Sequence, residues 1–351
     1  MRLASVDALR GLTVAAMLLV NNAGDWSHVH PWLAHAPWHG FAPPDLVFPL
    51  FLFIMGVSIT LGLAAPLARG DEAHALARKA LGRALRIVLL GLALHAVAWL
   101  ALEPRPFRPM GVLQRIGVCY GAAALLAIYL RPKGQWTVLA GLLLLHGAFL
   151  WWGGSLAPWV NLSDRLDTLL LGPHAYRFDA ASGSAHDPEG PLGTLSALAG
   201  TLLGVRAGQW LLQGRSRQLA LAALAALALG AAWSGVQPIN KNLWTPSFAL
   251  WAGGLSLLLL LLAHRWVDLG GRPPLGRSMG RNAITAYALA WLAAVGLAAS
   301  GAMPLLYGAL FAAPLQAFAP WVPSAAYALA FTTLVWALMR WFEHRGWRIT
   351  I

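Results

Sequence analysis

Charged side chains are scarce in this sequence. They make up only 11% of its 351 residues, whereas an ordinary soluble domain carries about 25%. So few charges cannot cover the surface of a globular protein of this size, which argues against a water-soluble enzyme. A single cysteine excludes a disulfide framework and a zinc site built from cysteines. Because 58% of the residues are hydrophobic, the composition predicts a helical membrane protein instead.

Acidic residues are fewer still. Lys and Arg number 25 against 13 Asp and Glu, which gives a formal net charge of +12. In a soluble protein this excess would indicate a nucleic-acid partner. Here the basic residues lie in short clusters between apolar runs, as in membrane proteins, where such clusters fix the orientation. We therefore expect contact with membrane lipid and no nucleic-acid binding.

Apolar runs that are candidates to cross a bilayer recur along the whole chain. A spanning helix needs about 20 such residues. Candidate spans lie at residues 9–20, 47–65, 85–102, 111–130, 136–152, 192–212, 219–233, 243–265, 282–302 and 323–341. The sequence thus predicts an all-α transmembrane bundle of about 10 spans, which forms a single domain over residues 1–351. Extracytoplasmic loops are expected at about 21–45, 153–191 and 303–322, the last as a hairpin rather than an eleventh span.

The basic residues also indicate the direction of the spans. With ten spans and the N-terminus inside, 19 of the 25 Lys and Arg residues fall on the cytoplasmic side and 6 on the other. An excess of this kind is typical of cytoplasmic loops. Both termini are therefore expected in the cytoplasm. The first segment is expected to be kept as a span, because Asp7 interrupts the basic start of a signal peptide.

Histidines gather in the first predicted extracytoplasmic loop. Four of the eleven lie within one 12-residue window, namely His28, His30, His35 and His39. Imidazole binds zinc, copper or nickel, but Pro31 and Pro37 interrupt any helix that would space the ligands, so no metal is expected. His28 and His30 are interpreted as solvent-exposed. His35 and His39 are candidates for a general base, because histidine titrates near neutral pH.

A buried charge is expected in the fourth predicted span. Arg115 lies near the start of an otherwise apolar helix, and a charge at membrane depth suggests a function and a partner. Asp45, which precedes the second span, is the most economical partner. The alternative is an arginine that extends its guanidinium to the outer interface, and the residues alone leave both interpretations open.

Two further segments carry polar groups suited to a sugar. The second long loop ends in HDPEGPLGTL, where two acids precede a helix start and would stabilise its N-terminal dipole. The segment QPINKNLWTPSF supplies amide and ammonium donors and a flat ring. Sugar hydroxyls need such donors, and the C–H face of a sugar packs on an aromatic ring. The residues alone leave open whether these are sugar contacts or ordinary polar loops.

Six blocks of sequence carry a family resemblance. In chain order they are SVDALRGLTVAAMLLVNNAG, HAPWHGFAPPDLVFPLFLFIMGVSI, GVLQRIGVCY, DPEGPLGTL, PINKNLWTPSF and GRNAITAY. Over essentially its whole length the chain resembles the heparan-α-glucosaminide N-acetyltransferase family and its bacterial membrane homologues. The resemblance implies an enzyme that moves acetyl from cytoplasmic acetyl-CoA to the amine of an extracytoplasmic amino sugar or glucosamine-containing glycan.

The resemblance also implies site residues. The catalytic histidine is expected to be His35, supported by Asn21 and by the acidic Asp45. Candidates for the sugar site are Asp187, Glu189, Asn240, Lys241, Asn242 and Trp244. Candidates for the CoA site at the cytoplasmic ends of the spans are Asp7, Arg10, Arg86, Arg115, Arg281 and Asn282, with Arg83 as an alternative to Arg86. Acetyl-CoA is the expected co-substrate, and no metal is expected.

The same resemblance implies a multi-pass protein of the bacterial inner membrane, with a homodimer as one expected assembly. An amino-sugar permease is the alternative function, because polar residues at mid-membrane and interrupted helices also suit transporters. The two halves of the chain show no clear internal repeat, which counts against a permease. The sequence leaves open which amino sugar is used and whether an acetyl-His35 intermediate forms.

Overall fold

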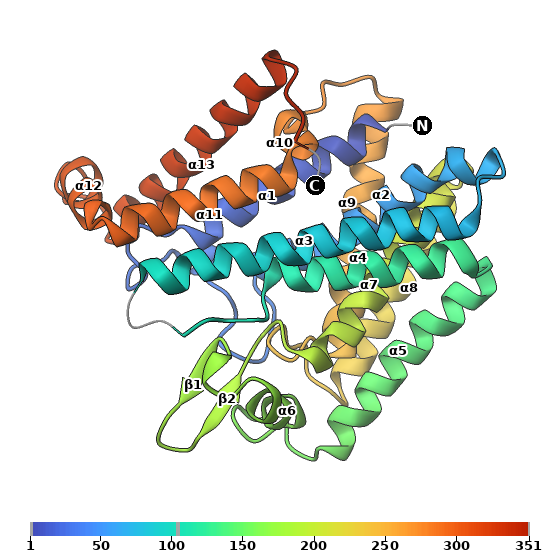
Figure 1. The fold of residues 1–351 in the computed structure, drawn as a ribbon, viewed down its shortest axis with the longest axis horizontal. Coiled ribbons are helices and arrows are strands. Elements are labelled where there is room, and N and C mark those ends of the chain that lie inside the picture. The colour runs from blue at the N-terminus through green and yellow to red at the C-terminus, as the bar shows by residue number, and fades with distance from the viewer. Residues whose placement is uncertain (1–2, 103–105, 350–351) are drawn as a thin grey trace.

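The computed structural model describes residues 3–102 and 106–349 and is almost entirely helical (Figure 1). The long helices are α1 (Ala4–Asn21), α2 (Val47–Ala68), α3 (Ala73–Ala101), α4 (Val112–Tyr129), α5 (Pro132–Trp152), α7 (Pro191–Leu212), α8 (Ser216–Ser234), α9 (Pro246–Ala263), α11 (Ala283–Ala299) and α13 (Trp321–His344). The shorter elements are α6 (Leu162–Leu170), α10 (Arg277–Arg281), α12 (Ala302–Tyr307), β1 (Arg177–Asp179) and β2 (Ser184–His186). Short 3₁₀ or π-helical turns lie at Pro31–Leu33, Pro43–Leu46, Gly172–His174, His264–Leu269 and Gly308–Ala312. The prediction of an all-α fold is confirmed, apart from one small hairpin.

Within the described residues, 8 helices are long and apolar enough to cross a membrane, and the bent pair α11–α12 would make 9. The helix α7 has 22 residues but is not among them. It packs against α2, α4, α5 and α9, and a helix enclosed by others needs less apolar surface toward lipid. Arg10 of α1 and Ile349 beyond α13 line one cavity, so α1 and the segment after α13 approach each other there. The chain is a multi-pass membrane protein, while ten spans and cytoplasmic termini remain predictions.

The segment after α11 differs from the expected hairpin. Residues 302–312 are helical, and this helix turns by 94° from the direction of α11. Gly301 breaks the chain between the two helices with a φ of +67°, a left-handed conformation that glycine adopts without steric cost. The helix α12 then begins with a proline near its first turn, where the missing N–H is not needed.

Glycines let two pairs of helices approach closely. A methyl group added at Gly204 of α7 would lie 2.0 Å from the carbonyl oxygen of Phe53 in α2, and one added at Gly56 would lie 2.0 Å from Thr201. The helices α1 and α10 meet in the same way at Gly280. Small residues allow backbones within a membrane to pack at such short distances. Both helix pairs are therefore fixed in position, and each pair carries residues of the sites described below.

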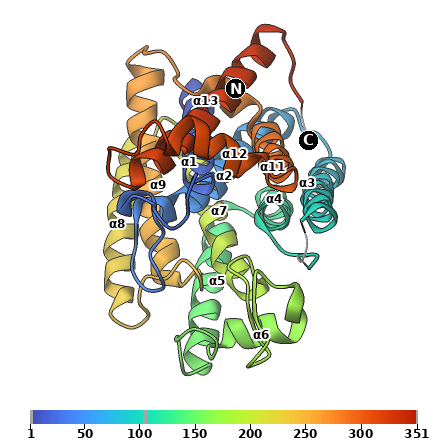
Figure 2. The same ribbon diagram turned by 90° about the vertical axis from the view of Figure 1, so that its left-hand side faces the viewer.

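Residues 153–191, predicted as a loop, form a small lobe of α6 and the hairpin β1–β2 at one edge of the bundle (Figure 1 and Figure 2). In the antiparallel hairpin Arg177 pairs with His186 and Asp179 with Ser184. Asn161 caps α6 by accepting a hydrogen bond from the Asp164 N–H at 2.9 Å. Each strand has only 3 residues, which is too short for the alternation that identifies a strand from sequence.

Candidate active site

His35 and Asp45 form a hydrogen-bonded pair where α2 begins. The His35 Nδ1 atom lies 2.7 Å from Asp45 Oδ1. Two prolines start the turn Pro43–Leu46, and this turn lets Asp45 Oδ2 accept the N–H of Ala42 at 2.9 Å and that of Ala36 at 3.2 Å. The Asp45 side chain is fully buried, whereas the His35 side chain is 40% exposed. A fixed carboxylate thus orients an accessible imidazole, and it selects the tautomer with a proton on Nδ1.

Lys241, from the loop between α8 and α9, lies against the same pair. Its Nζ atom is 3.0 Å from His35 Nδ1, 3.2 Å from His35 Nε2 and 3.7 Å from Asp45 Oδ1. Burial lowers the pKa of the Lys241 ammonium, and the charges of Asp45 and Glu189 partly offset this effect. The structure thereby joins two predicted groups of residues in one cluster, which we call the histidine site (His35, Asp45 and Lys241).

His39 has a different partner. Its Nδ1 atom lies 3.2 Å from Asn240 Nδ2, and burial lowers the pKa of its imidazole. Asn240 is itself fully buried, and its Oδ1 accepts the N–H of Leu243 at 2.9 Å. Asn240 therefore stabilises the conformation of the loop between α8 and α9. Within the described residues His39 has no carboxylate partner, so the geometry distinguishes it from His35.

The remaining two histidines of the loop lie outside this cluster. His28 is exposed, as the sequence predicts, and its Nδ1 atom is 2.7 Å from Asp25 Oδ2. The ring of His30 is only half-exposed, because it packs edge-on against Trp321 with 4.5 Å between ring centroids.

Asn21 ends α1 and is exposed. It lines a separate cavity of about 310 Å³, together with Tyr287 and Trp291 of α11. Within the described residues no hydrogen bond joins Asn21 to the histidine site. A supporting role for Asn21 therefore remains a prediction.

Arg115 does not pair with Asp45, which was one of the two interpretations that the sequence left open, and it does not extend to an interface either. Its side chain is completely buried, its Nη2 atom donates to the Gly190 carbonyl oxygen at 2.9 Å, and its guanidinium lies 5.0 Å from the centroid of the Trp244 ring. Arg115 thus contacts the Gly190 carbonyl and the face of the Trp244 ring. The Asp45 carboxylate binds His35 instead. Arg115 also lies outside the basic cavity described below, so the structure does not support its assignment to the CoA phosphates.

Trp244 is a core residue, in contrast to the expected sugar platform. It is only 2% exposed, and its ring lies 5.3 Å from Phe48 and 5.3 Å from Phe248, centroid to centroid. The apolar surfaces of α2 and α9 cover this ring, because it stands directly before the first turn of α9. The neighbouring Asn242 is half-buried.

Asp187 and Glu189 bind an arginine. The Nε and Nη2 atoms of Arg108 donate to the two carboxylate oxygens of Asp187 at 2.9 and 2.6 Å, and Nη2 also donates to Glu189 at 2.5 Å. Burial acts to lower the pKa of Arg108, but the two carboxylates outweigh it and raise this pKa. Asp187 is therefore a structural anchor. Glu189 lies close enough to Lys241 to act on its charge.

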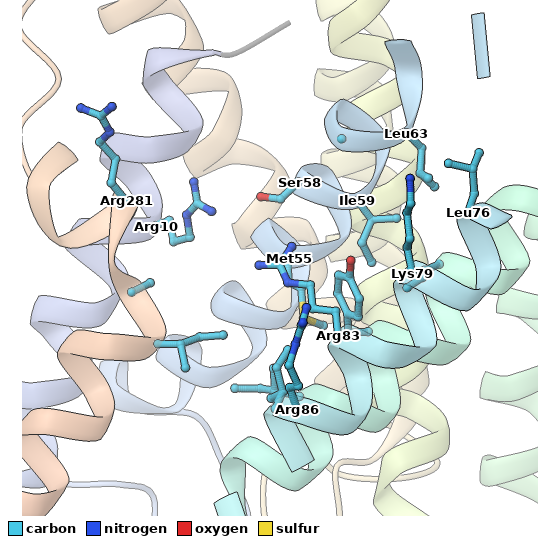
Figure 3. Close-up of a pocket in the computed structure, with 18 of the residues that line it drawn as sticks. Arg10, Met55, Ser58, Ile59, Leu63, Leu76, Lys79, Arg83, Arg86 and Arg281 are labelled. Carbon is cyan, nitrogen blue, oxygen red and sulfur yellow. The ribbon is translucent and has the colours of Figure 1, made fainter. Parts of the chain in front are cut away.

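A basic cavity of about 470 Å³ opens near the opposite end of α2 (Figure 3). Its charged lining residues are the cations Arg10, Arg69, Lys79, Arg83, Arg86 and Arg281 and the acid Asp71. Figure 3 shows Lys79, Arg83 and Arg86 on one helix, with Arg10 and Arg281 on other helices across the cavity. Among the lining residues cations exceed acids by five, so the cavity suits a ligand with several phosphate groups.

Four of the predicted cofactor residues meet in this cavity, namely Arg10, Arg86, Arg281 and Asn282. Asp7 does not line it but pairs with Arg10 one turn along α1. Arg281 donates to Glu343 at 2.8 Å. Lys79 and Arg86, by contrast, make no ion pair with any described residue. These two cations are therefore available to an incoming anion.

Lys79 and Arg69 of the cavity were not predicted. Lys79, Arg83 and Arg86 are spaced at i, i+4 and i+7, which places them on one face of a helix. This signal is present in the sequence, but an orientation charge explains each residue equally well. Arg108 was also missed, because only the fold brings it to acids about 80 positions away.

The fold and these two sites define a multi-pass membrane protein with a histidine–carboxylate pair and a separate basic cavity. A family model described as "Heparan-alpha-glucosaminide N-acetyltransferase, catalytic" matches residues 2–165. The human heparan-alpha-glucosaminide N-acetyltransferase is 29% identical over 335 residues, which cover 77% of this chain and 49% of the human protein. The mouse protein of the same name is 29% identical over 338 residues, or 77% of this chain and 50% of the mouse protein. The chain is similar to this family, as the resemblance implied, and spans about half the length of these relatives.

Proposed function

We propose that this protein transfers an acetyl group from acetyl-CoA to the amine of an amino sugar, with the two substrates bound toward opposite ends of α2. The arrangement along α2 supports this proposal. Asp45 lies at the start of this helix, and Phe51, six residues further on, already lines the basic cavity. Six residues correspond to about 9 Å along a helix. A flexible thioester arm held in the cavity can therefore approach the imidazole of His35.

His35 is the proposed general base. The amine must lose a proton as it attacks the carbonyl carbon of the thioester. With Nδ1–H donated to Asp45, the lone pair of His35 Nε2 can accept this proton. In the balanced step the C–N bond forms and the C–S bond breaks. The CoA thiolate then takes the proton from the imidazolium, which leaves an N-acetylated amino sugar and CoA.

Lys241 is the proposed oxyanion stabiliser. Its Nζ atom lies 3.2 Å from His35 Nε2, and the amine must meet the thioester carbonyl close to that nitrogen. An ammonium held there stabilises the negative charge that develops on the carbonyl oxygen. When the substrates bind, Nζ is expected to move from the imidazole to this oxygen. Asn21, which the resemblance placed in support of His35, has no part in this proposed step.

The basic cavity is the proposed site for the CoA phosphates. Its volume of about 470 Å³ falls within the range of about 300–1,000 Å³ of small-molecule sites. Lys79 and Arg86 would bind the phosphates directly, because neither is engaged by an acid among the described residues. We place this cavity on the cytoplasmic side, since its cations belong to the predicted inner cluster of basic residues. A reporter fused after Asp71 should then read cytoplasmic, and one inserted near Asp164 extracytoplasmic.

The test of this function is an assay of purified protein in proteoliposomes, with acetyl-CoA and a panel of glucosamine, glucosamine-terminated oligosaccharides and N-acetylglucosamine. We expect release of CoA only with sugars that carry a free amine. N-acetylglucosamine is the matched control, because its amine is already acylated. Movement of sugar across the membrane without consumption of acetyl-CoA would identify a permease instead, and no CoA release with any amine would refute the proposal.

A further inference from the structure

Three side chains of metal-ligating type meet inside the small lobe. Asp164 and Asp167 come from α6 and His186 from β2, and all three are buried. Each can bring one ligand atom to within 4.8 Å of the others. Asp164 and Asp167 lie one helical turn apart, so both carboxylates project from the same face of α6. The register of the hairpin sets His186 opposite this face.

Hydrogen bonds inside the protein leave two buried atoms of this cluster without a partner. Asp164 is satisfied, because its Oδ1 contacts His186 Nδ1 at 2.6 Å and its Oδ2 accepts the N–H of Trp159 at 2.5 Å. Asp167 Oδ2 accepts the N–H of Asp187 at 2.9 Å. Asp167 Oδ1 and His186 Nε2, however, are buried without any hydrogen-bond partner among the described residues. Buried polar atoms are nearly always satisfied, so each exception calls for an unseen partner.

The charge around the cluster is also unbalanced. Asp164, Asp167 and Asp187 are each at most 1% exposed. Arg108 neutralises Asp187, and His186 pairs with Asp164 at 2.6 Å, but within the described residues Asp167 forms no ion pair. Buried carboxylates are costly unless they are paired or coordinate a metal. A cation bound beside Asp167 would remove this cost.

We propose that Asp164, Asp167 and His186 bind a divalent transition-metal ion of the zinc class, which fastens the hairpin to α6. One imidazole and two carboxylates suit Zn²⁺ or Mn²⁺. Ca²⁺ and Mg²⁺ prefer more ligands, all of them oxygen atoms. The role of the ion would be structural, because it would fix the segment that follows His186. In this segment Asp187 binds Arg108, and the Gly190 carbonyl accepts a hydrogen bond from Arg115. This inference does not depend on the proposed transferase activity.

The test measures metal in the full-length purified protein. The protein is stripped with a chelator and titrated with Zn²⁺ alone, and bound metal is counted by elemental analysis after dialysis. We expect one Zn²⁺ per chain and a higher melting temperature with Zn²⁺. Replacement of the bound ion by Co²⁺ should give visible absorption bands typical of a protein-ligated ion. Asp167→Asn should weaken Zn²⁺ binding at least about tenfold. Even the loss of a group that only hydrogen-bonds to a metal ligand costs about 10–100-fold in affinity.

Asp167→Asn keeps an oxygen that can accept the N–H of Asp187, so the variant should fold. Asp179→Asn is the matched control, because this carboxylate lies exposed on β1 of the same hairpin. His28→Ala controls for ions held by the exposed histidine loop. Wild-type protein without stoichiometric Zn²⁺ would overturn the proposal. So would equal Zn²⁺ affinity in wild type and Asp167→Asn, or a loss of affinity in His28→Ala alone.

Discussion

The histidine site and the basic cavity hold their charges in opposite ways. In the histidine site Asp45 is fully buried and accepts hydrogen bonds from His35 and from two backbone N–H groups. In the basic cavity Lys79 and Arg86 are exposed and make no ion pair with a described residue. Side chains held by partners keep a fixed geometry, as proton transfer requires. Exposed, unpaired cations instead retain their capacity to bind an anion. The first arrangement is the one we expect for the proposed reaction, and the second is the one we expect for the proposed CoA site.

The largest effect is expected when the proposed general base, His35, is removed. His35→Ala should lower kcat by about 10²–10⁴-fold, the usual cost of losing a general base. Binding of CoA should remain, because His35 is not among the described residues that line the basic cavity. The measurement is steady-state acetyl transfer together with CoA affinity by calorimetry.

His28→Ala is the control for this experiment, since His28 lies in the same loop but pairs only with Asp25. It should keep near wild-type turnover and the same melting temperature. An equal loss of CoA affinity and of turnover in His35→Ala would show that the two sites are not separate.

Removal of the cation beside the base should have the next largest effect. Lys241→Met should lower kcat by about 10–10³-fold, because loss of one oxyanion donor costs about 10²–10³-fold and water replaces part of it. Lys241→Arg keeps the charge and should retain more activity than Lys241→Met. The comparison is made on kcat at saturating substrate. A rise in KM with unchanged kcat in Lys241→Met would instead assign Lys241 to sugar binding.

The sequence predicted the helical architecture well, because apolar runs and interrupting prolines are local features of the chain. It failed where a segment was short or where partners were distant. The hairpin β1–β2 has three residues in each strand, so no periodic pattern marks it. The bend after α11 depends on the single residue Gly301 at positive φ. Neither feature has enough residues to give a periodic signal.

The candidate site shows the same limit. The pair His35–Asp45 spans only 10 positions, and a family resemblance was enough to select both residues. Lys241 meets them across 206 positions, which only the packed helices can establish. The sequence left the partner of Arg115 open for the same reason: Gly190 offers a backbone carbonyl, and no side-chain pattern reveals that acceptor. Trp244 was predicted to contact a sugar, because the sequence alone does not show that the fold buries its ring between α2 and α9.

A smaller effect is expected at the basic cavity. Replacement of both Lys79 and Arg86 by alanine should weaken CoA binding by about 10–100-fold, because a hydrogen bond to a charged group contributes about 1.5–3 kcal/mol before solvent screening reduces it. Turnover at saturating acetyl-CoA should change little. Arg78→Ala is the matched control, since Arg78 is exposed on the same helix but does not line the cavity. Unchanged affinity in the double variant, or an equal loss in Arg78→Ala, would remove the phosphates from this cavity.

The smallest effect is expected for the second histidine of the active-site loop. His39 contacts the amide of Asn240 and has no carboxylate partner among the described residues, so it lacks the group that would orient it as a base. His39→Ala should therefore cost less than about tenfold in kcat, the equivalent of one neutral hydrogen bond of about 0.5–1.5 kcal/mol. His39→Gln, which keeps a polar contact for Asn240, should recover part of this loss, and the melting temperature of each variant reports any disturbance of the loop. If His39→Ala abolished turnover while His35→Ala retained more than about a tenth of it, a loss too small for a general base, the base would be His39 and Asp45 would be only the anchor of the turn that begins α2.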